Sequence, residues 1–199
     1  MIAKRCFDLL AAAIGLIVLG PVFVALAVWI AIDSKGPVFF RQIRVGMGGK
    51  PFKIHKFRTM RAETQATGLQ ITVGADQRIT RVGHFIRKYK LDELPQLIDV
   101  FIGNMSLVGP RPEVPYYVDK YPEPIRATVL SVRPGITDWC SILYRNESEL
   151  LASAPNPDLF YTNILIPKKL EYHLNYVKNR SFGGDLLIIL RTLTALGSK

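Results

Sequence analysis

Lys90-Leu91-Asp92-Glu93-Leu94-Pro95-Gln96-Leu97 is the stretch around which the rest of the chain is organised. Proline has no amide hydrogen and is tolerated in a helix only in its first turn, so Pro95 predicts a helix that begins near Asp92 and continues through Phe101. Two adjacent acids would then lie at a helix N-terminus, where free amides and the helix dipole favour a carboxylate or a phosphate. Acids in first turns also serve helix stability alone, so the surrounding sequence has to decide between the two roles.

The composition favours an anionic partner for one domain of ordinary size. The 199 residues include 26 Lys and Arg against 16 Asp and Glu, which gives a formal net charge of +10. This balance suits nucleic acid, an anionic membrane surface or a phosphorylated substrate, and charge alone does not choose among them. Cys6 and Cys140 form no paired motif and the three histidines lack metal-ligand spacing, so neither a disulfide framework nor a zinc site is expected.

The region between Asp8 and Asp33 contains no charged residue and is nearly all apolar. About two dozen such residues can cross a ~30 Å hydrocarbon core as one helix. Gly20-Pro21 lies near the middle, where proline interrupts helical hydrogen bonding, and each half alone is too short to cross. Basic residues flank both ends, which suits a segment that enters and leaves on the cytoplasmic side. From these features a kinked single span and a helix-break-helix hairpin both stay open, whereas no cleavage site supports a signal peptide.

The chain after the apolar region begins with basic elements. Two partly alternating runs around a glycine-rich turn predict a β-hairpin over 41–60. The polar stretch 61–77 is expected to be a loop. Apolar residues at helical spacing predict a basic amphipathic helix over 79–88, which brings Arg87 close to Asp92 in the chain. An arginine so near the acids can fork onto a diphosphate.

The second half of the chain is predicted to be mostly helical. Pro110 and Pro112 hold the backbone around Arg111 extended, which presents its guanidinium from a stiff loop suited to a phosphate. Trp139 and the residues after it, up to Glu147, look like a short strand that ends in polar groups. Helices are expected over 116–130, interrupted at 121–124, and over 167–179. A shorter apolar segment over 185–196 is too short to span and is expected either to lie in the membrane interface or to pack against the membrane hairpin.

Taken together, these stretches resemble the bacterial sugar transferases, specifically the monotopic phosphoglycosyl transferases that start glycan assembly on a polyprenyl phosphate. The resemblance covers nearly the whole chain. It rests on the order and spacing of the Pro-broken apolar segment and five later blocks, which are Lys56-Phe57-Arg58-Thr59-Met60, Leu91-Asp92-Glu93-Leu94-Pro95-Gln96, Gly103-Asn104-Met105-Ser106, Gly109-Pro110-Arg111-Pro112 and Arg133-Pro134-Gly135-Ile136-Thr137.

The resemblance implies an α+β fold in two parts. Residues 1–34 would form a re-entrant membrane hairpin with its break at Gly20 and Pro21, which favours the hairpin over the single span. Residues 35–199 would form a mostly helical catalytic domain with a short β-hairpin and amphipathic helices in the interface. This domain would lie on the cytoplasmic face of the bacterial inner membrane.

The resemblance also implies a reaction. Asp92 matches the nucleophile that attacks the β-phosphate of a UDP-sugar, releases UMP and retains the phosphosugar. Glu93 matches the partner carboxylate that helps Asp92 to bind Mg²⁺. A polyprenyl phosphate, with undecaprenyl phosphate as the expected form, then takes the phosphosugar in a ping-pong route. The basic residues expected to contact substrate are Arg87, Arg111, Lys56, Arg58, Arg133 and Arg145.

Two points stay open at this stage. Many members continue after the threonine with Gly-Leu and later Asn-Gly-Arg, whereas this chain has Asp138-Trp139 and Tyr144-Arg145-Asn146-Glu147, which leaves the donor sugar undetermined. The alternatives to the transferase are a membrane-tethered basic protein that binds nucleic acid or anionic lipid without catalysis, and a hydrolase that uses water as acceptor. The transferase reading includes membrane lipid as a partner, excludes nucleic acid and leaves a homodimer open.

Overall fold

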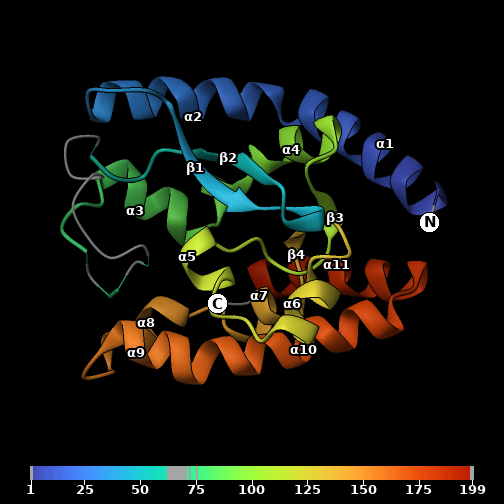
Figure 1. The fold of residues 1–199 in the computed structure, drawn as a ribbon. Helices are drawn as coiled ribbons and strands as arrows, with labels where there is room; N and C mark the ends of the chain where they lie inside the picture. The colour runs from blue at the N-terminus through green and yellow to red at the C-terminus, as the bar shows by residue number, and fades with distance from the viewer. Residues whose placement is uncertain (1, 62–70, 72, 75, 198–199) are drawn as a thin grey trace.

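The computed structural model describes residues 2–61, 71, 73–74 and 76–197. Figure 1 shows a bent helix pair along the top, a β-hairpin with short helices in the middle, and a group of helices from the C-terminal part below. The fold is therefore α+β and mostly helical, as predicted. The predicted loop at 61–77 lies largely outside the described residues.

The apolar N-terminal region forms α1 (Ile2–Val18) and α2 (Gly20–Asp33), which meet at 60°. Pro21 lies in the first turn of α2, so its missing amide hydrogen falls at the predicted break. Within the described ranges no single helix is long and apolar enough to cross a membrane, whereas the bent pair passes that test by length and composition. The bend itself was thus predictable from Gly20-Pro21.

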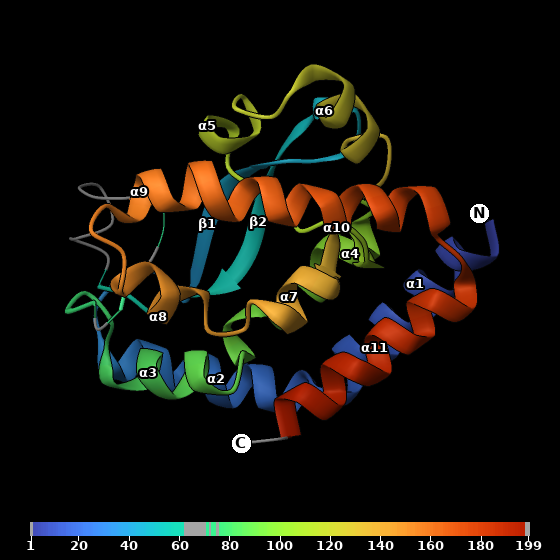
Figure 2. The same ribbon diagram turned by 90° about the horizontal axis from the view of Figure 1, so that it is seen from below.

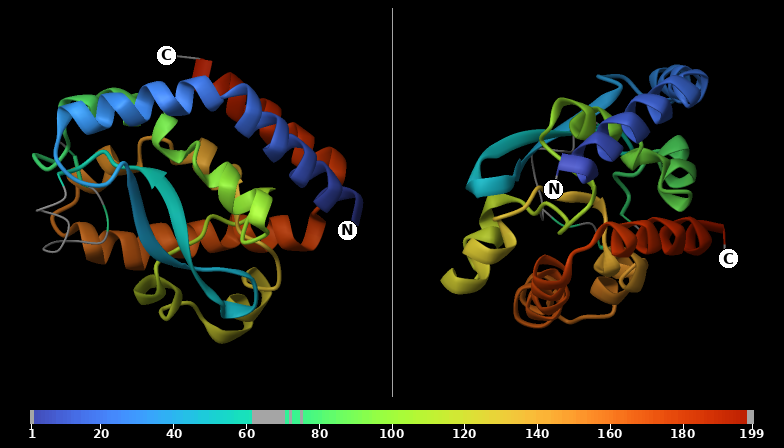
Figure 3. Two further views of the ribbon diagram at one scale, coloured as in Figure 1. Left: turned by 90° about the horizontal axis from the view of Figure 1, so that it is seen from above. Right: turned by 90° about the vertical axis from the view of Figure 1, so that its right-hand side faces the viewer.

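Charged side chains at the start of α1 fasten this helix to the rest of the molecule. Asp8 is 2% exposed and accepts a hydrogen bond of 2.8 Å from the hydroxyl of Ser106. Lys4 pairs with Asp185 of the last helix at 2.6 Å. Figure 3 shows the first and last helices on the same side of the molecule. Polar contacts, and not only apolar packing, therefore set the position of α1.

The predicted hairpin is confirmed. β1 (Phe39–Val45) pairs with β2 (Pro51–Phe57) in an antiparallel sheet, with Phe39 opposite Phe57 and Val45 opposite Pro51. The turn between them uses Gly48 and Gly49 at φ values of +68° and +77°, which a residue with a side chain adopts only with strain. The hairpin places one face of β2 against the helices that follow it.

Two short helices and a second small sheet follow the hairpin. Thr80 caps α3 (Arg81–Lys88), and α4 (Gln96–Ile102) comes after the acid-containing turn. β3 (Ser106–Val108) and β4 (Gly135–Thr137) form a parallel pair that was not predicted, because each strand has only three residues and its partner is remote in sequence.

The parallel pair requires glycine where the two strands are closest. A Cβ on Gly135 would lie 2.1 Å from the backbone nitrogen of Gly109, a distance that no side chain can occupy. This close approach fixes the loop after β3 directly against β4. Arg111 lies on that loop, so the sheet determines where its backbone runs.

The lower group combines short helices with the longer α10 (Ile166–Asn179) and α11 (Phe182–Gly197), as Figure 2 shows from below. Its short elements are α5 (Pro115–Val118), α6 (Glu123–Val129), α7 (Trp139–Leu143), α8 (Glu147–Ala152), α9 (Pro157–Phe160) and a π-helical turn at Tyr161–Leu165. The interrupted helix over 116–130 and the long helix over 167–179 are confirmed.

Two predictions in this part were wrong. The residues from Trp139 form the helix α7 and not a strand, because Asp138 caps it and accepts a 2.7 Å hydrogen bond from the amide of Ser141. The last helix begins at Phe182 rather than at Asp185, and the hydroxyl of Ser181 accepts from the amide of Gly184 at its start. In both places a local side-chain cap decided the structure.

Buried apolar clusters hold these layers together, and two of them bear on the position of the site. The larger one joins the end of β1 to α5, α6, α8 and α10, and includes Val45, Tyr117, Leu151 and Leu170. The other packs Leu26 and Ile30 of α2 against Phe57 of β2 and Val82 and Ile86 of α3. The second cluster anchors α3, so the arginine at its end, Arg87, is held next to the hairpin.

Candidate active site

The two acids lie on a single 3₁₀ turn, Leu91–Glu93, between α3 and α4. Lys90 precedes the turn at φ +55°, a left-handed conformation that is uncommon for a residue with a side chain. The helix was expected to begin near Asp92, but α4 begins at Gln96. The backbone before it turns with 3₁₀-type hydrogen bonds, so the acids precede the α-helix by about one turn.

Glu93 is held by two cations from different segments. Lys56 of β2 donates to Oε1 at 2.7 Å. Arg111 forks onto the carboxylate, with Nη1 at 2.9 Å from Oε2 and Nη2 paired with Oε1. Burial alone would raise the pKa of Glu93, but Arg111 and Lys56 outweigh it and hold the pKa well below its usual value. Glu93 is therefore an ionised anchor for both cations.

Asp92 has a different environment from its neighbour. Its Oδ1 is buried and accepts no hydrogen bond from the described part of the chain. Burial raises the pKa of Asp92, Lys56 opposes that effect, and the charge on Glu93 adds to it. A buried carboxylate oxygen without a partner is costly unless a ligand, a cation or water completes it. Asp92 is thus the acid with an oxygen available for chemistry.

Arg87 is placed beside the acids by the packing of α3. Its Nε donates to the hydroxyl of Thr59 at 2.8 Å. Burial lowers the pKa of Arg87, whereas the nearby charge of Asp92 raises it. A Cβ on Gly83 would lie 2.1 Å from the carbonyl oxygen of Thr59, so only glycine lets α3 approach this closely. The structure therefore brings Arg87, Lys56 and Arg111 together around the acids.

The other three predicted substrate contacts lie elsewhere. Arg58 is 2% exposed, and its Nη2 donates to the carbonyl oxygen of Ser34 at 2.5 Å. Arg133 donates through Nε to the carbonyl oxygen of Gly103 at 2.9 Å. Arg145 donates through Nη1 to the carbonyl oxygen of Ala195. Each of these guanidiniums binds the backbone of another segment, which is a structural contact.

Two residues near the acids were missed in the sequence. Arg44 of β1 donates to the carbonyl oxygen of Pro112 at 3.0 Å and lies 3.6 Å from Glu113, so it supports the loop that carries Arg111. Gln96 is 1% exposed, and neither polar atom of its side chain has a partner in the described ranges. The signal for Gln96 was its place in the same sequence block as the acids.

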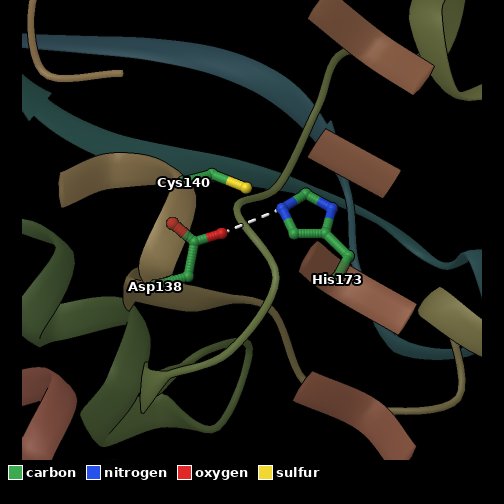
Figure 4. Close-up of side chains that lie close together, drawn as sticks. All are labelled: Asp138, Cys140 and His173. Carbon is green, nitrogen blue, oxygen red and sulfur yellow. Dashed lines mark hydrogen bonds and ion pairs between the residues drawn. The ribbon is translucent and has the colours of Figure 1, made fainter. Parts of the chain in front are cut away.

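A second cluster of potentially reactive side chains lies next to the arginine loop, residues 109–112, which carries Arg111. Asp138, Cys140 and His173 are all buried, and their potential ligand atoms lie within 4.8 Å of one another. Figure 4 shows the imidazole of α10 facing the carboxylate and thiol that come from the start of α7. Nε2 of His173 is 2.8 Å from Oδ2 of Asp138. Residues this far apart in sequence have no spacing that could reveal the cluster.

Comparisons with known proteins agree on the family. A family model described as bacterial sugar transferase matches residues 1–199. The chain is 39% identical over 195 residues to the UDP-N-acetylgalactosamine-undecaprenyl-phosphate N-acetylgalactosaminephosphotransferase of Aeromonas hydrophila, across 97% of this chain and 43% of that protein. It is 36% identical over 193 residues to the UDP-glucose:undecaprenyl-phosphate glucose-1-phosphate transferase of Escherichia coli (strain K12), across 96% of this chain and 39% of that protein.

A shorter relative matches over most of its own length. The uncharacterized sugar transferase EpsL of Bacillus subtilis (strain 168) is 39% identical over 193 residues, across 97% of this chain and 86% of that protein. The chain thus spans less than half of the two longer relatives but most of EpsL. Because the family model covers every residue, the chain belongs to the bacterial sugar transferase family.

Proposed function

We propose that this chain transfers a phosphosugar from a UDP-sugar to a polyprenyl phosphate through a covalent intermediate on Asp92. The observation that carries the proposal is the contrast within the acid pair. Glu93 has both oxygens neutralised by Lys56 and Arg111, whereas Oδ1 of Asp92 is buried and has no partner among the residues that the structure describes. A carboxylate that acts as a nucleophile needs an oxygen that is not already committed to a cation.

The reaction would proceed in two displacements. A carboxylate oxygen of Asp92 attacks the β-phosphorus of the donor, the bond from that phosphorus to the bridging oxygen breaks, and UMP leaves with the electron pair. A phosphate oxygen of the polyprenyl phosphate then attacks the same phosphorus, and the bond to Asp92 breaks. Lys56, Arg87 and Arg111 would stabilise the charge on the phosphoryl oxygens in both steps.

The charges at the site support a requirement for Mg²⁺. Two acids and three cations leave one positive charge, and the donor diphosphate brings about two negative charges, so the loaded site would carry an excess negative charge that a divalent cation would offset. The unpaired Oδ1 of Asp92 fits such a cation. The oxygens of Glu93 are both engaged by Lys56 and Arg111, so a direct metal contact by Glu93 would need one of these side chains to move. When bound, Mg²⁺ supplies charge neutralisation to the phosphate oxygens.

The apolar surface of the helices supports a membrane-bound location. We infer that residues 1–34 form a re-entrant hairpin and that residues 35–199 lie at its cytoplasmic side. Large apolar residues of α1 and α2 are exposed to the surroundings, including Leu10, Ile14, Ile17, Val18, Val24, Val28, Trp29 and Ile32. The last helix adds exposed Leu187, Leu190 and Leu193. Such a surface is typical of contact with lipid, which carries the acceptor.

The names of the relatives support the substrate classes but not one donor. One relative is named for UDP-N-acetylgalactosamine and another for UDP-glucose, and both are named for undecaprenyl phosphate. We therefore propose undecaprenyl phosphate as the acceptor. The donor is to be found by testing UDP-sugars that differ in the epimer and in the N-acetyl group.

The proposal is tested by the intact mass of the protein. Nanodisc-held protein is mixed with Mg²⁺ and a panel of UDP-sugars without a lipid acceptor. The native chain and the exposed-surface control Asp119→Asn should gain the mass of one phosphosugar and release UMP, whereas Asp92→Asn should gain nothing. Adding undecaprenyl phosphate should then remove the adduct. An adduct on Asp92→Asn, or UMP release only when the acceptor is present, would contradict the covalent route.

A further inference from the structure

Asp138 is a junction that joins three segments of the chain. Its carboxylate is 2% exposed and accepts two hydrogen bonds on each oxygen. Oδ1 accepts from the amide and the hydroxyl of Ser141, both at 2.7 Å. Oδ2 accepts from Nε2 of His173 at 2.8 Å and from the backbone nitrogen of Arg111 at 3.4 Å. The junction therefore connects α7, α10 and the arginine loop.

The protonation of this pair follows from the charge on the carboxylate. Burial would raise the pKa of Asp138, but His173 and Ser141 outweigh burial and lower it to about 2. An ionised carboxylate can only accept hydrogen bonds, so the proton between the two groups lies on Nε2 of His173. The imidazole thus acts as a donor to Asp138.

The cluster is better suited to hydrogen bonding than to holding a cation. Both oxygens of Asp138 already accept from protein donors, and Nε2 of His173 carries a proton. Burial raises the pKa of the Cys140 thiol, and its Sγ lies 3.6 Å from the carbonyl oxygen of Lys169. A thiol that stays protonated is a poor metal ligand. The three groups therefore form a structural junction.

Besides Asp138, the arginine loop is tied to β4 at its start and to the lower group just after its end, where Glu113 accepts a hydrogen bond from the hydroxyl of Tyr161. The amide of Gly109 donates to the carbonyl oxygen of Thr137 at 3.1 Å, and the amide of Gly135 donates to the carbonyl oxygen of Pro110 at 3.0 Å. The next contact along the loop is the bond from Arg111 to Asp138. The side chain of Arg111 then reaches out to Glu93 and is 29% exposed, so a ligand can reach it.

We propose that Asp138 and His173 are positioning residues, in which His173 orients the Asp138 carboxylate and Asp138 holds the backbone of Arg111, so that the guanidinium meets Glu93 and a phosphate in one geometry. Nδ1 of His173 is buried without a partner in the described ranges, which is a cost that an apolar residue would not carry. The role of the histidine therefore lies in the donor at Nε2. The catalytic part of this proposal rests on the proposed function, whereas the structural part, the positioning of Arg111, does not.

The structural part is tested by hydrogen exchange of the full chain in nanodiscs, without turnover. The peptide that covers residues 109–113 should exchange faster in Asp138→Asn and in His173→Leu than in the native chain. His173→Gln should exchange like the native chain, because the amide nitrogen of glutamine can replace Nε2 as the donor. Leu151→Ala, a truncation in the larger apolar cluster, controls for general loss of stability. Unchanged exchange at 109–113 in His173→Leu would overturn the proposal.

The catalytic part is tested by a double-mutant cycle on the rate of UMP release. Asp138→Asn should lower kcat/KM roughly ten-fold in the native background but cause little further loss in Arg111→Ala, because the two changes then remove one interaction. Equal losses in both backgrounds would overturn the positioning role, and so would failure of His173→Gln to keep the native rate. If no donor releases UMP from the native chain, the proposed function fails, whereas the exchange result still decides the positioning of Arg111.

Discussion

The buried acids Asp138 and Asp92 are satisfied in opposite ways. Asp138 accepts two hydrogen bonds on each oxygen from groups that the fold supplies. Asp92 is also buried at Oδ1, but the described chain offers that oxygen no donor. The comparison shows that burial and an acidic side chain do not define a reactive site. What sets Asp92 apart is a buried carboxylate oxygen that the described chain leaves without a donor, which a ligand, a cation or water can complete.

Loss of the unsatisfied oxygen should have the largest effect. Asp92→Asn keeps the size of the side chain but removes the nucleophilic carboxylate, so adduct formation should fall by on the order of 10³-fold or more. Glu93→Gln, measured beside it, should still form a slow adduct, because Glu93 only anchors Lys56 and Arg111. Intact mass against time measures both. An equal loss of adduct formation in the two variants would show that the neighbouring acids do not have different roles.

Replacing the bidentate guanidinium of Arg111 should have the next largest effect. Arg111→Lys keeps the charge but loses the bidentate contact with Glu93, so kcat/KM for the donor should fall by about 10- to 100-fold. The matched control is Arg41→Lys, because Arg41 is exposed and donates a hydrogen bond to the carbonyl oxygen of Lys53, away from the acids. A rate within two-fold of the native chain in Arg111→Lys would show that charge alone is sufficient there.

The pH dependence should show the coupling between Lys56 and Asp92. Burial raises the pKa of Asp92 and Lys56 opposes that rise, so Lys56→Met should raise it further. Only the ionised carboxylate attacks phosphorus, so the rate of adduct formation is lost as the pH falls through this pKa. The acidic limb of the pH profile should therefore move to higher pH in Lys56→Met and stay in place in the exposed control Lys50→Met. If the acidic limb stays in place in Lys56→Met, Lys56 does not influence the pKa of Asp92.

The smallest effect on chemistry is expected at the outlying arginines. Arg133 was expected from the sequence to contact substrate, but its Nε bonds the carbonyl oxygen of Gly103. Arg133→Met should lower the melting temperature by a few degrees, because the partly buried carbonyl of Gly103 loses its donor, and leave the rate of adduct formation within about two-fold. A large rise in KM for the donor at unchanged stability would restore the sequence-based expectation.

The sequence predicted the parts of the fold that depend on local pattern. Gly20-Pro21 located the bend, and alternation around a glycine-rich turn located the hairpin. The five residues from Trp139 are too few to distinguish a helix from a strand by periodicity, and the cap supplied by Asp138 decided for the helix. The parallel pair of β3 and β4 depends on contacts between remote segments, which no local pattern carries.

The candidate site likewise contains residues that local sequence blocks predicted and residues whose roles depend on the folded arrangement. Asp92, Glu93, Arg87 and Arg111 stand in or next to short sequence blocks, and the structure brings them together with Lys56. Arg58, Arg133 and Arg145 stand in equally basic contexts but bind backbone carbonyls. Residue type cannot distinguish these roles, because a guanidinium binds a carbonyl and a phosphate with the same donors. Only the arrangement of the chain separates them.

The ion pair between Lys4 and Asp185 constrains the order in which the chain can mature. These residues are 181 positions apart, so α1 meets this partner only after the chain up to Asp185 has been synthesised. Asp8 bonds to Ser106, which is made earlier, so α1 can dock before the ion pair with the last helix closes. A chain truncated before Asp185 should therefore show faster amide hydrogen exchange at the start of α1 than the 199-residue chain.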